Sequence, residues 1–233
     1  MLLFWKKSFS GSRISKEETT MLKKYKWTML ITSVITLLPI LLGLILWDRL
    51  PEQIATHFDA NGVADDWSSR GFAVFGLPLI LLAVQWLCML GTAADPKQKN
   101  ISGKAITLVL WIIPVVSLLC NAAVYAYALE IPFNMATGIG IFIGIVFLVI
   151  GNYLPKSRQN YTMGIKIPWT LHDENNWNAT HRFAGRLYMV LGLLVIALSI
   201  CGLLAWMLPI LIACVLVPVL YSYVYYVWHK TDA

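Results

Sequence analysis

Six long runs of uncharged, mostly apolar residues constrain this chain more than any other feature of its sequence. Each run has about the 17–25 residues that a helix needs to cross a bilayer. Backbone polar groups cannot stay unpaired in hydrocarbon, so such runs form helices or a closed barrel, and the lack of alternation favours helices. The runs span approximately residues 27–47, 72–91, 105–129, 136–152, 187–207 and 209–228.

The sequence therefore predicts an all-α, polytopic integral membrane protein with six transmembrane helices. Composition agrees, because charged residues make up 13% of the 233 positions, whereas a soluble domain has about 25%. The four cysteines lie inside the apolar runs without a paired or metal-binding spacing, which is typical of small buried side chains. We expect no cofactor and no metal.

The lysines and arginines are distributed unevenly among the connecting segments. Sixteen of the 18 lie in the N-terminal segment, the second and fourth loops and the tail, and only Arg49 and Arg70 lie in the alternate loops. The positive-inside rule therefore predicts that both termini face the cytoplasm. The net charge of +6 is explained by this topology and by anionic lipid, so the lipid bilayer is the expected partner and direct binding of nucleic acid is not expected.

These boundaries divide the chain into three parts. Residues 1–26 form a basic cytoplasmic or interfacial segment, as either a short surface helix or a flexible anchor. Residues 27–92 form the first helix pair with an extracytoplasmic loop at 48–71, and residues 93–233 form the other four helices with a cytoplasmic loop at 153–186.

Short connections shape the four-helix part. They predict that helices three and four, and helices five and six, are tight antiparallel hairpins, the second with its break at 207–209. Gly140 and Gly144 in the fourth helix have the spacing of a close-packing motif, although chance explains this spacing nearly as well.

The extracytoplasmic loop reads LPEQIATHFDANGVADDWSSR from Leu50 to Arg70. Its Asn-Gly pair predicts a turn. Its His and Asp side chains are of the kind that hold a divalent cation, but their spacing matches no known metal loop. We expect instead that Asp59 and Asp65 cap turns and pair with Arg49 or Arg70. The candidate contact residues of this loop are Pro51, His57, Phe58, Gly62, Asp65, Trp67 and Arg70.

The cytoplasmic loop is a polar segment, Gly151–Arg186, between two apolar runs. Lys156 and Arg158 follow the fourth helix, where cations complement a helix C-terminus and lipid phosphates. Thr170 and Asp173 have the spacing of a capping box, which predicts a helix that starts at Thr170 and continues into helix five.

Trp177 and His181 are one turn apart on that helix, and Glu174 lies nearly on the same face. They form either a proton-sensitive contact site, since His titrates near neutral pH, or an interfacial helix whose rings mark the headgroup level. The candidate partner or signalling residues are Asn152, Pro155, Lys156, Arg158, Asn160, Gly164, Lys166, Pro168, Trp169, Thr170, Glu174, Trp177, Thr180, His181 and Arg182.

Both loops carry patterns that resemble a known family. The outer pattern, LPxxIxxHFxxxGxADxWxxR, is similar to a bacterial membrane domain of uncharacterised function found at the N-terminal end of the SdpI family. The inner pattern, GNxLPKxRxNxxxGIKxPWTLxxExxWxxTHR, resembles the SdpI family itself. Together the patterns and the helices cover the chain from about residue 48 to its end. The departures from the commoner residues are Ala55, Arg70, Lys166, Ile167 and Asn176.

The resemblance implies a multi-pass immunity and signal-transduction protein of the bacterial cell membrane. Members of the family protect their cell from a secreted killing peptide that collapses the membrane potential, and the founding member recruits a cytosolic transcriptional repressor. The implied partners are therefore a secreted toxin peptide and such a repressor, the latter held by the cytoplasmic loop.

Two other classes of protein compete with this interpretation. A secondary transporter or channel is the alternative, although Gln85 and Asn121 are the only clearly polar residues in the middle of a run and are equally suited to packing helices together. An enzyme is not expected, because catalytic motifs such as HExxH and GxSxG are missing and His57 and His181 are predicted on opposite sides of the bilayer.

Overall fold

The computed structural model of the chain describes residues 13–59, 62–132 and 134–230, so the interpretation of residues 1–12 as part of a surface segment lies outside the described residues. The helices and strands are α2 (Arg13–Ile45), β1 (Gln53–Phe58), β2 (Ala64–Ser69), α3 (Leu77–Ala93), α4 (Gly103–Ala128), α5 (Met135–Tyr153), α6 (Pro168–His172), α7 (Glu174–Ile200) and α8 (Met207–Lys230). Short 3-10 turns occupy Trp47–Arg49, Gln98–Asn100, Leu154–Lys156 and Leu204–Trp206, and a π-helical turn, Phe72–Gly76, leads into α3.

The helical prediction is confirmed. Six helical segments of the described chain are long and apolar enough to cross a membrane, and each overlaps one of the apolar runs of the sequence. They are Thr20–Ile45, Phe72–Ala93, Gly103–Ala128, Met135–Lys156, Glu174–Ile200 and Met207–His229.

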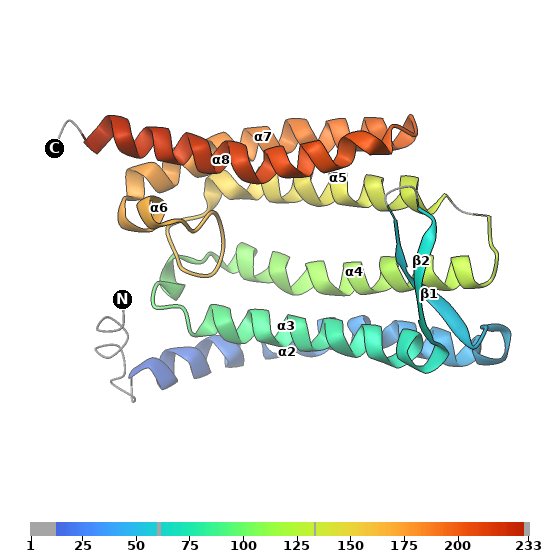
Figure 1. Cartoon of the computed structure of the whole chain (residues 1–233). Helices are drawn as coiled ribbons and strands as arrows, with labels where there is room; N and C mark the ends of the chain where they lie inside the picture. The colour runs from blue at the N-terminus through green and yellow to red at the C-terminus, as the bar shows by residue number, and fades with distance from the viewer. Residues whose placement is uncertain (1–12, 60–61, 133, 231–233) are drawn as a thin grey trace.

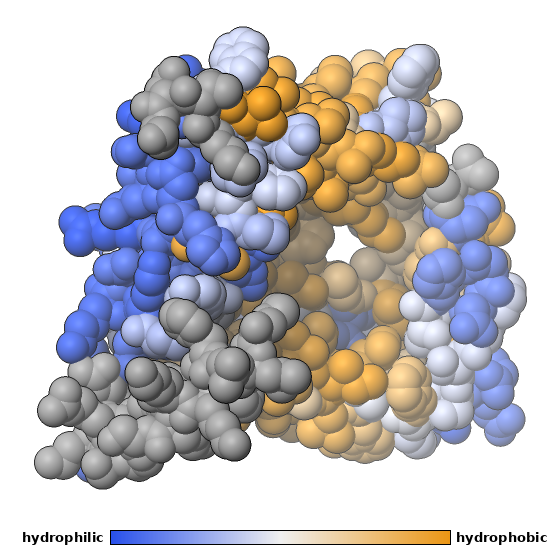
Figure 2. All heavy atoms as spheres, turned by 60° about the vertical axis from the view of Figure 1, so that its left-hand side comes forward, coloured by the Kyte–Doolittle hydropathy of each residue, from blue (hydrophilic) through white to orange (hydrophobic). Residues whose placement is uncertain are grey.

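The spans are arranged in two groups of three. Helices α2, α3 and α4 pack together, and α5, α7 and α8 form the second group, while α4 and α5 hardly touch (Figure 1). Figure 2 shows an opening between the two groups, with hydrophobic residues around it. The predicted α7–α8 hairpin is confirmed, but the predicted close pairing of helices three and four is wrong. Their connection is short, yet α5 packs along α7 instead.

The α5–α7 contact explains this choice of partner. A Cβ atom on Gly144 would lie 2.5 Å from Ile196 Cγ1 and 2.7 Å from the backbone oxygen of Gly192. One on Gly151 would lie 2.8 Å from the backbone oxygen of Gly185. The glycines of each helix therefore admit the backbone of the other, which is the close approach that small residues allow between membrane helices.

The loop between α2 and α3 contains a hairpin that the sequence did not reveal. Strands β1 and β2 are antiparallel, with Gln53 opposite Ser69 and irregular pairing near His57. Its inward side is buried, because Ile54 packs with Val74 and Tyr125. Gly62 has φ +77°, and a Cβ atom there would lie 2.8 Å from that of Ala136 in α5. The hairpin thus contacts both helix groups.

The two ends of the bundle differ in content. Figure 1 shows the start of α2, the α3–α4 connection, α6 and the end of α8 at one end, and the hairpin at the other. The predicted break at 207–209 is wrong: α7 ends at Ile200, Gly202 adopts φ +73°, and α8 begins at Met207. Pro209 lies in the first turn of α8, where a missing N–H costs no intrahelical hydrogen bond.

Candidate functional site

The segment 153–186, here called the motif loop, is built around two stacked rings. The rings of Trp177 and His181 lie 4.0 Å apart at 20°, and these residues are 0% and 1% exposed. His181 Nδ1 lies 2.8 Å from the backbone oxygen of Trp177, and its Nε2 lies 3.0 Å from the backbone nitrogen of Ile165. A carbonyl only accepts and an amide N–H only donates, so Nδ1 carries the proton and the ring is neutral.

Gly164 covers this stack. It adopts φ +113°, and a Cβ atom on it would collide with His181 Nε2 and lie 3.1 Å from the Trp177 ring. Glu174 is exposed, so the predicted Glu–Trp–His stripe does not form. The two rings are inside the protein and fix the loop above them, whereas the sequence interpretation left them either as a contact site or as markers of the headgroup level.

The predicted capping box at Thr170 is wrong. A short helix, α6, starts at Pro168, and Thr170 is its third residue; its Oγ1 accepts from the backbone N–H of Ile167 at 3.1 Å and lies 2.8 Å from the backbone oxygen of Ile165. Asp173 then caps α7, with its Oδ1 accepting from Asn175 N at 2.8 Å. Pro168 suits the first position of a helix, because its N–H would be unpaired there in any case. The continuation of α7 into the fifth span is confirmed.

A buried carboxylate ties the motif loop to the α3–α4 connection. Asp95 is 3% exposed; its Oδ2 accepts from the Tyr161 backbone N–H at 2.9 Å and from Thr162 Oγ1 at 2.6 Å. Its Oδ1 accepts from Lys97 N at 2.7 Å. Because α3 and α5 belong to different helix groups, this carboxylate joins the groups. Sequence reasoning missed Asp95, whose one signal is an Asp-Pro pair in an otherwise basic loop.

Gln159 makes a second tie at the same place. Its Nε2 donates to the backbone oxygens of Thr170 and Leu171 at 2.8 and 3.0 Å. Its own backbone oxygen accepts from Asn100 Nδ2 at 2.7 Å, and its Oε1 accepts from Lys97 Nζ. Gln159 occupies a position that the family-like pattern leaves open, so the sequence gave no reason to single it out.

The remaining candidates of the motif loop divide by burial. Thr180 is buried and donates to Asn176 Oδ1, which also accepts from Ser222 Oγ of α8 at 2.6 Å, while Asn176 Nδ2 donates to the Ser222 backbone oxygen at 3.0 Å. Trp169 is half-buried beside Tyr223 and Tyr226. The other buried candidate is Asn160, which caps the turn at Thr162 and Met163. The exposed candidates are Asn152, Pro155, Lys156, Arg158, Gly164, Lys166, Pro168, Glu174 and Arg182.

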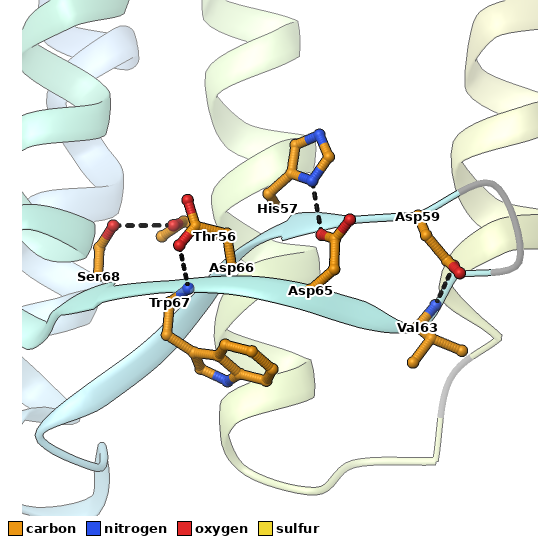
Figure 3. Close-up of polar contacts among 8 residues, drawn as sticks. All are labelled: Thr56, His57, Asp59, Val63, Asp65, Asp66, Trp67 and Ser68. Atoms are coloured by element: carbon orange, nitrogen blue, oxygen red, sulfur yellow. Dashed lines mark hydrogen bonds and ion pairs between the residues drawn. The ribbon is translucent and has the colours of Figure 1, made fainter.

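At the opposite end, the hairpin brings His57 and Asp65 together. His57 Nδ1 lies 2.6 Å from Asp65 Oδ1 in an exposed ion pair (Figure 3). The pKa of His57 is raised from 6.5 by this hydrogen bond and by the negative charge of Asp65. Trp67 projects from the other face of the hairpin and is 52% exposed.

The predicted charge pairing in this loop needs correction. Asp59 closes the turn as predicted, with its Oδ1 accepting from Val63 N at 2.8 Å (Figure 3), but Asp65 pairs with His57 rather than an arginine. Arg70 instead donates to the backbone oxygens of Trp47 and Leu50 and lies over the Trp47 ring. Bulge geometry near His57 brings the imidazole to Asp65, which spacing alone does not reveal.

The other hairpin candidates are placed as follows. Pro51 is exposed, and Phe58 meets Tyr127 of α4 edge to face at 4.9 Å. Within the described residues, no three His, Cys, Asp or Glu side chains form a metal-binding group. His57 and His181 lie at opposite ends of the bundle, so one reaction centre cannot contain both (Figure 1).

Six apolar spans with a polar, folded loop at one end and a hairpin at the other define a small multi-pass membrane protein. Residues 156–225 match the sequence model of the SdpI/YfhL protein family, and residues 34–82 match a domain of unknown function, DUF1648. The chain is 28% identical to the Immunity protein SdpI of Bacillus subtilis (strain 168) over 175 aligned residues. This alignment covers 73% of the present chain and 80% of the relative. No solved structure matches the chain.

The predicted resemblance to the SdpI family is confirmed by this family model and this relative. Together with the six spans, they identify the chain as a multi-pass bacterial membrane protein.

Proposed function

We propose that this protein protects its cell against a secreted, membrane-active peptide, and that the motif loop couples it to a cytosolic partner. The observation that carries the proposal is the similarity to an immunity protein over most of the chain. The matches of residues 34–82 and 156–225 to the two sequence models add support from the hairpin and from most of the motif loop. The six spans place the protein in the membrane that such a peptide attacks.

The hairpin is the surface that we assign to the peptide. Fourteen of the 16 lysines and arginines among the described residues lie in the segments at the other end, so the positive-inside rule supports an outward-facing hairpin. Val63 and Trp67 are 60% and 52% exposed on it, beside the His57–Asp65 pair. Exposed apolar side chains next to charged ones suit an amphipathic peptide.

The motif loop is the surface that we assign to the partner. Its backbone is fixed by Trp177, His181 and Asp95, while Lys156, Arg158 and Lys166 are exposed on it. An ordered loop that presents several cations fits a partner with an acidic surface, and the family resemblance supports a transcriptional repressor.

A killing assay tests protection. Sensitive bacteria that express the chain are exposed to a secreted, membrane-depolarising peptide, and survival and membrane potential are recorded. We expect retained potential with the wild type and loss of protection with Trp67→Ala, while the matched Val34→Ala variant, an exposed apolar residue of α2, stays protective. Equal killing with and without the protein would contradict the proposal.

A secondary transporter or channel is the alternative, because a series of hydrogen-bonded polar side chains connects α2, α3 and α4 within the apolar spans. Gln85 donates to Thr32 Oγ1 at 2.6 Å and accepts from Thr36 Oγ1 at 2.8 Å, and Ser117 donates to the Thr36 backbone oxygen. These groups bond one another, as in packed membrane helices. Substrate-dependent flux into liposomes containing the protein would favour transport over immunity.

A further inference from the structure

A small pocket at the end of the motif loop combines two arginines with two aromatic rings, and the proposed immunity function does not explain this combination. It lies between α7 and α8, has a volume of about 300 Å³, and is lined by Ala179, Arg182, Phe183, Arg186 and Tyr221. Spacings of three and four residues put the four α7 members on one helix face. The rings of Phe183 and Tyr221 stack at 4.3 Å and 7°, which gives the pocket a flat apolar wall.

Both arginines of the pocket are available to an anion. Each is exposed, and the one hydrogen bond shown for them runs from Arg182 Nε to the backbone oxygen of Asn178 at 3.2 Å. Across the described residues, neither guanidinium has a carboxylate within ion-pair distance. One turn of helix separates the two residues, so two forked donors face the same pocket.

Two helices independently place the pocket at the membrane boundary. Arg186 is the last charged residue of α7, and the uncharged run 187–207 begins directly after it. Tyr221 begins the aromatic cluster that ends α8, and such clusters mark the headgroup level. Arginine at this depth reaches the phosphate layer with its charged end while its stem stays in apolar surroundings.

We propose that Arg182 and Arg186 bind the phosphodiester of an anionic phospholipid, with its glycerol and upper acyl chains against the Phe183–Tyr221 wall. Guanidinium groups bind phosphate through paired, charge-assisted hydrogen bonds, and a lipid supplies the apolar part that the wall fits. An acidic segment of a protein partner would satisfy the arginines but would leave the aromatic wall at the membrane boundary without an apolar contact.

Native mass spectrometry of the purified, delipidated chain tests the site. The protein in detergent is titrated with phosphatidylglycerol, and the Kd of the first bound lipid is measured. We expect Arg182→Gln/Arg186→Gln to weaken binding by about tenfold or more, and Arg182→Lys/Arg186→Lys, which keeps the charge but loses the fork, to weaken it by a smaller factor.

A charge-matched control separates the pocket from general attraction to basic protein. Lys23→Gln/Lys26→Gln removes two exposed cations from the same end of the bundle and should leave the Kd unchanged. Equal weakening by this control, an unchanged Kd in the arginine variants, or equal affinity for phosphatidylcholine would overturn the proposal. Displacement of the lipid by equimolar inorganic phosphate would also overturn it, since the site would then bind free anions.

Discussion

His181 and His57 lie at the two ends of this molecule and are in opposite environments. At the motif loop, Gly164 lies on the ring of His181, which accepts from the next backbone N–H and leaves no room for a side chain. At the hairpin, His57 instead lies in solvent beside Asp65. One histidine is therefore neutral and structural, while the other is able to change charge with pH.

Gly164→Ala should destabilise the motif loop. Alanine would be strained at φ +113° and its Cβ would collide with His181, so we expect a loss of about 2 kcal/mol or more and faster trypsin cleavage after Lys166. Gly202→Ala is the matched control, since Gly202 has φ +73° but open space around it. Cleavage of both variants at the wild-type rate would show that the Gly164 contact is unimportant.

The His57–Asp65 pair should make the stability of the hairpin depend on pH. Because the folded pKa of His57 is raised above 6.5, the stabilisation is fully present below about pH 6.5 and is lost as pH rises through the raised value. An NMR titration of the imidazole should show a lower pKa in Asp65→Asn. Asp66→Asn, which removes a weaker charge effect, should lower it less. Identical titrations of all three proteins would refute the pairing.

At the scale of elements, the sequence predicted the transmembrane helices, which depend on the length of uncharged runs. It missed the hairpin and the starts of α6 and α7, which depend on side-chain contacts. The six spans were predicted from the lengths of the apolar runs. The polar helical segment before the fifth run also predicted that one helix would continue into the fifth span. The start of α6 at Pro168 and the cap at Asp173 were missed, because Thr170 was an equally good cap by type. The hairpin was missed because its strands are short, polar and irregular near His57.

The α5–α7 contact gives a prediction at this scale. Gly144→Ala places a methyl group 2.7 Å from the Gly192 backbone oxygen, and a helix backbone cannot move aside as a side chain can. We expect a destabilisation of about 1–3 kcal/mol, seen as a lower Tm in detergent. Gly91→Ala in α3 has nothing within 4 Å and should keep or raise the Tm, because alanine favours a helix. An unchanged Tm in Gly144→Ala would mean that the helices are not closely packed.

The whole molecule consists of two three-helix groups that are joined mainly at their ends. The hairpin contacts both groups at one end, and Asp95 and Gln159 join them at the other, while an apolar opening separates them between (Figures 1 and 2). Loop lengths could not predict this arrangement, because a short α4–α5 connection is compatible with either packed or separated helices. We therefore expect a change at the hairpin to reach the motif loop through the relative position of the groups.

Asp95→Ala tests this arrangement. Removing the carboxylate leaves the Tyr161 N–H and Thr162 hydroxyl without their acceptor, at a cost of about 1–3 kcal/mol. With the native cysteines replaced, spin labels at Trp111 on α4 and Ile145 on α5, both exposed, report the distance between the groups. We expect a broader distance distribution in Asp95→Ala than in the wild type.

Asp48→Ala provides the control, because Asp48 is an exposed carboxylate in the connection that leads to the hairpin and holds no part of the motif loop. Its distance distribution should match that of the wild type. If Asp95→Ala also matched the wild type while trypsin cut its motif loop faster, Asp95 would order the loop without joining the groups. The groups would then be joined by the Gln159 contacts at the motif-loop end and by the Phe58 and Gly62 contacts at the hairpin end.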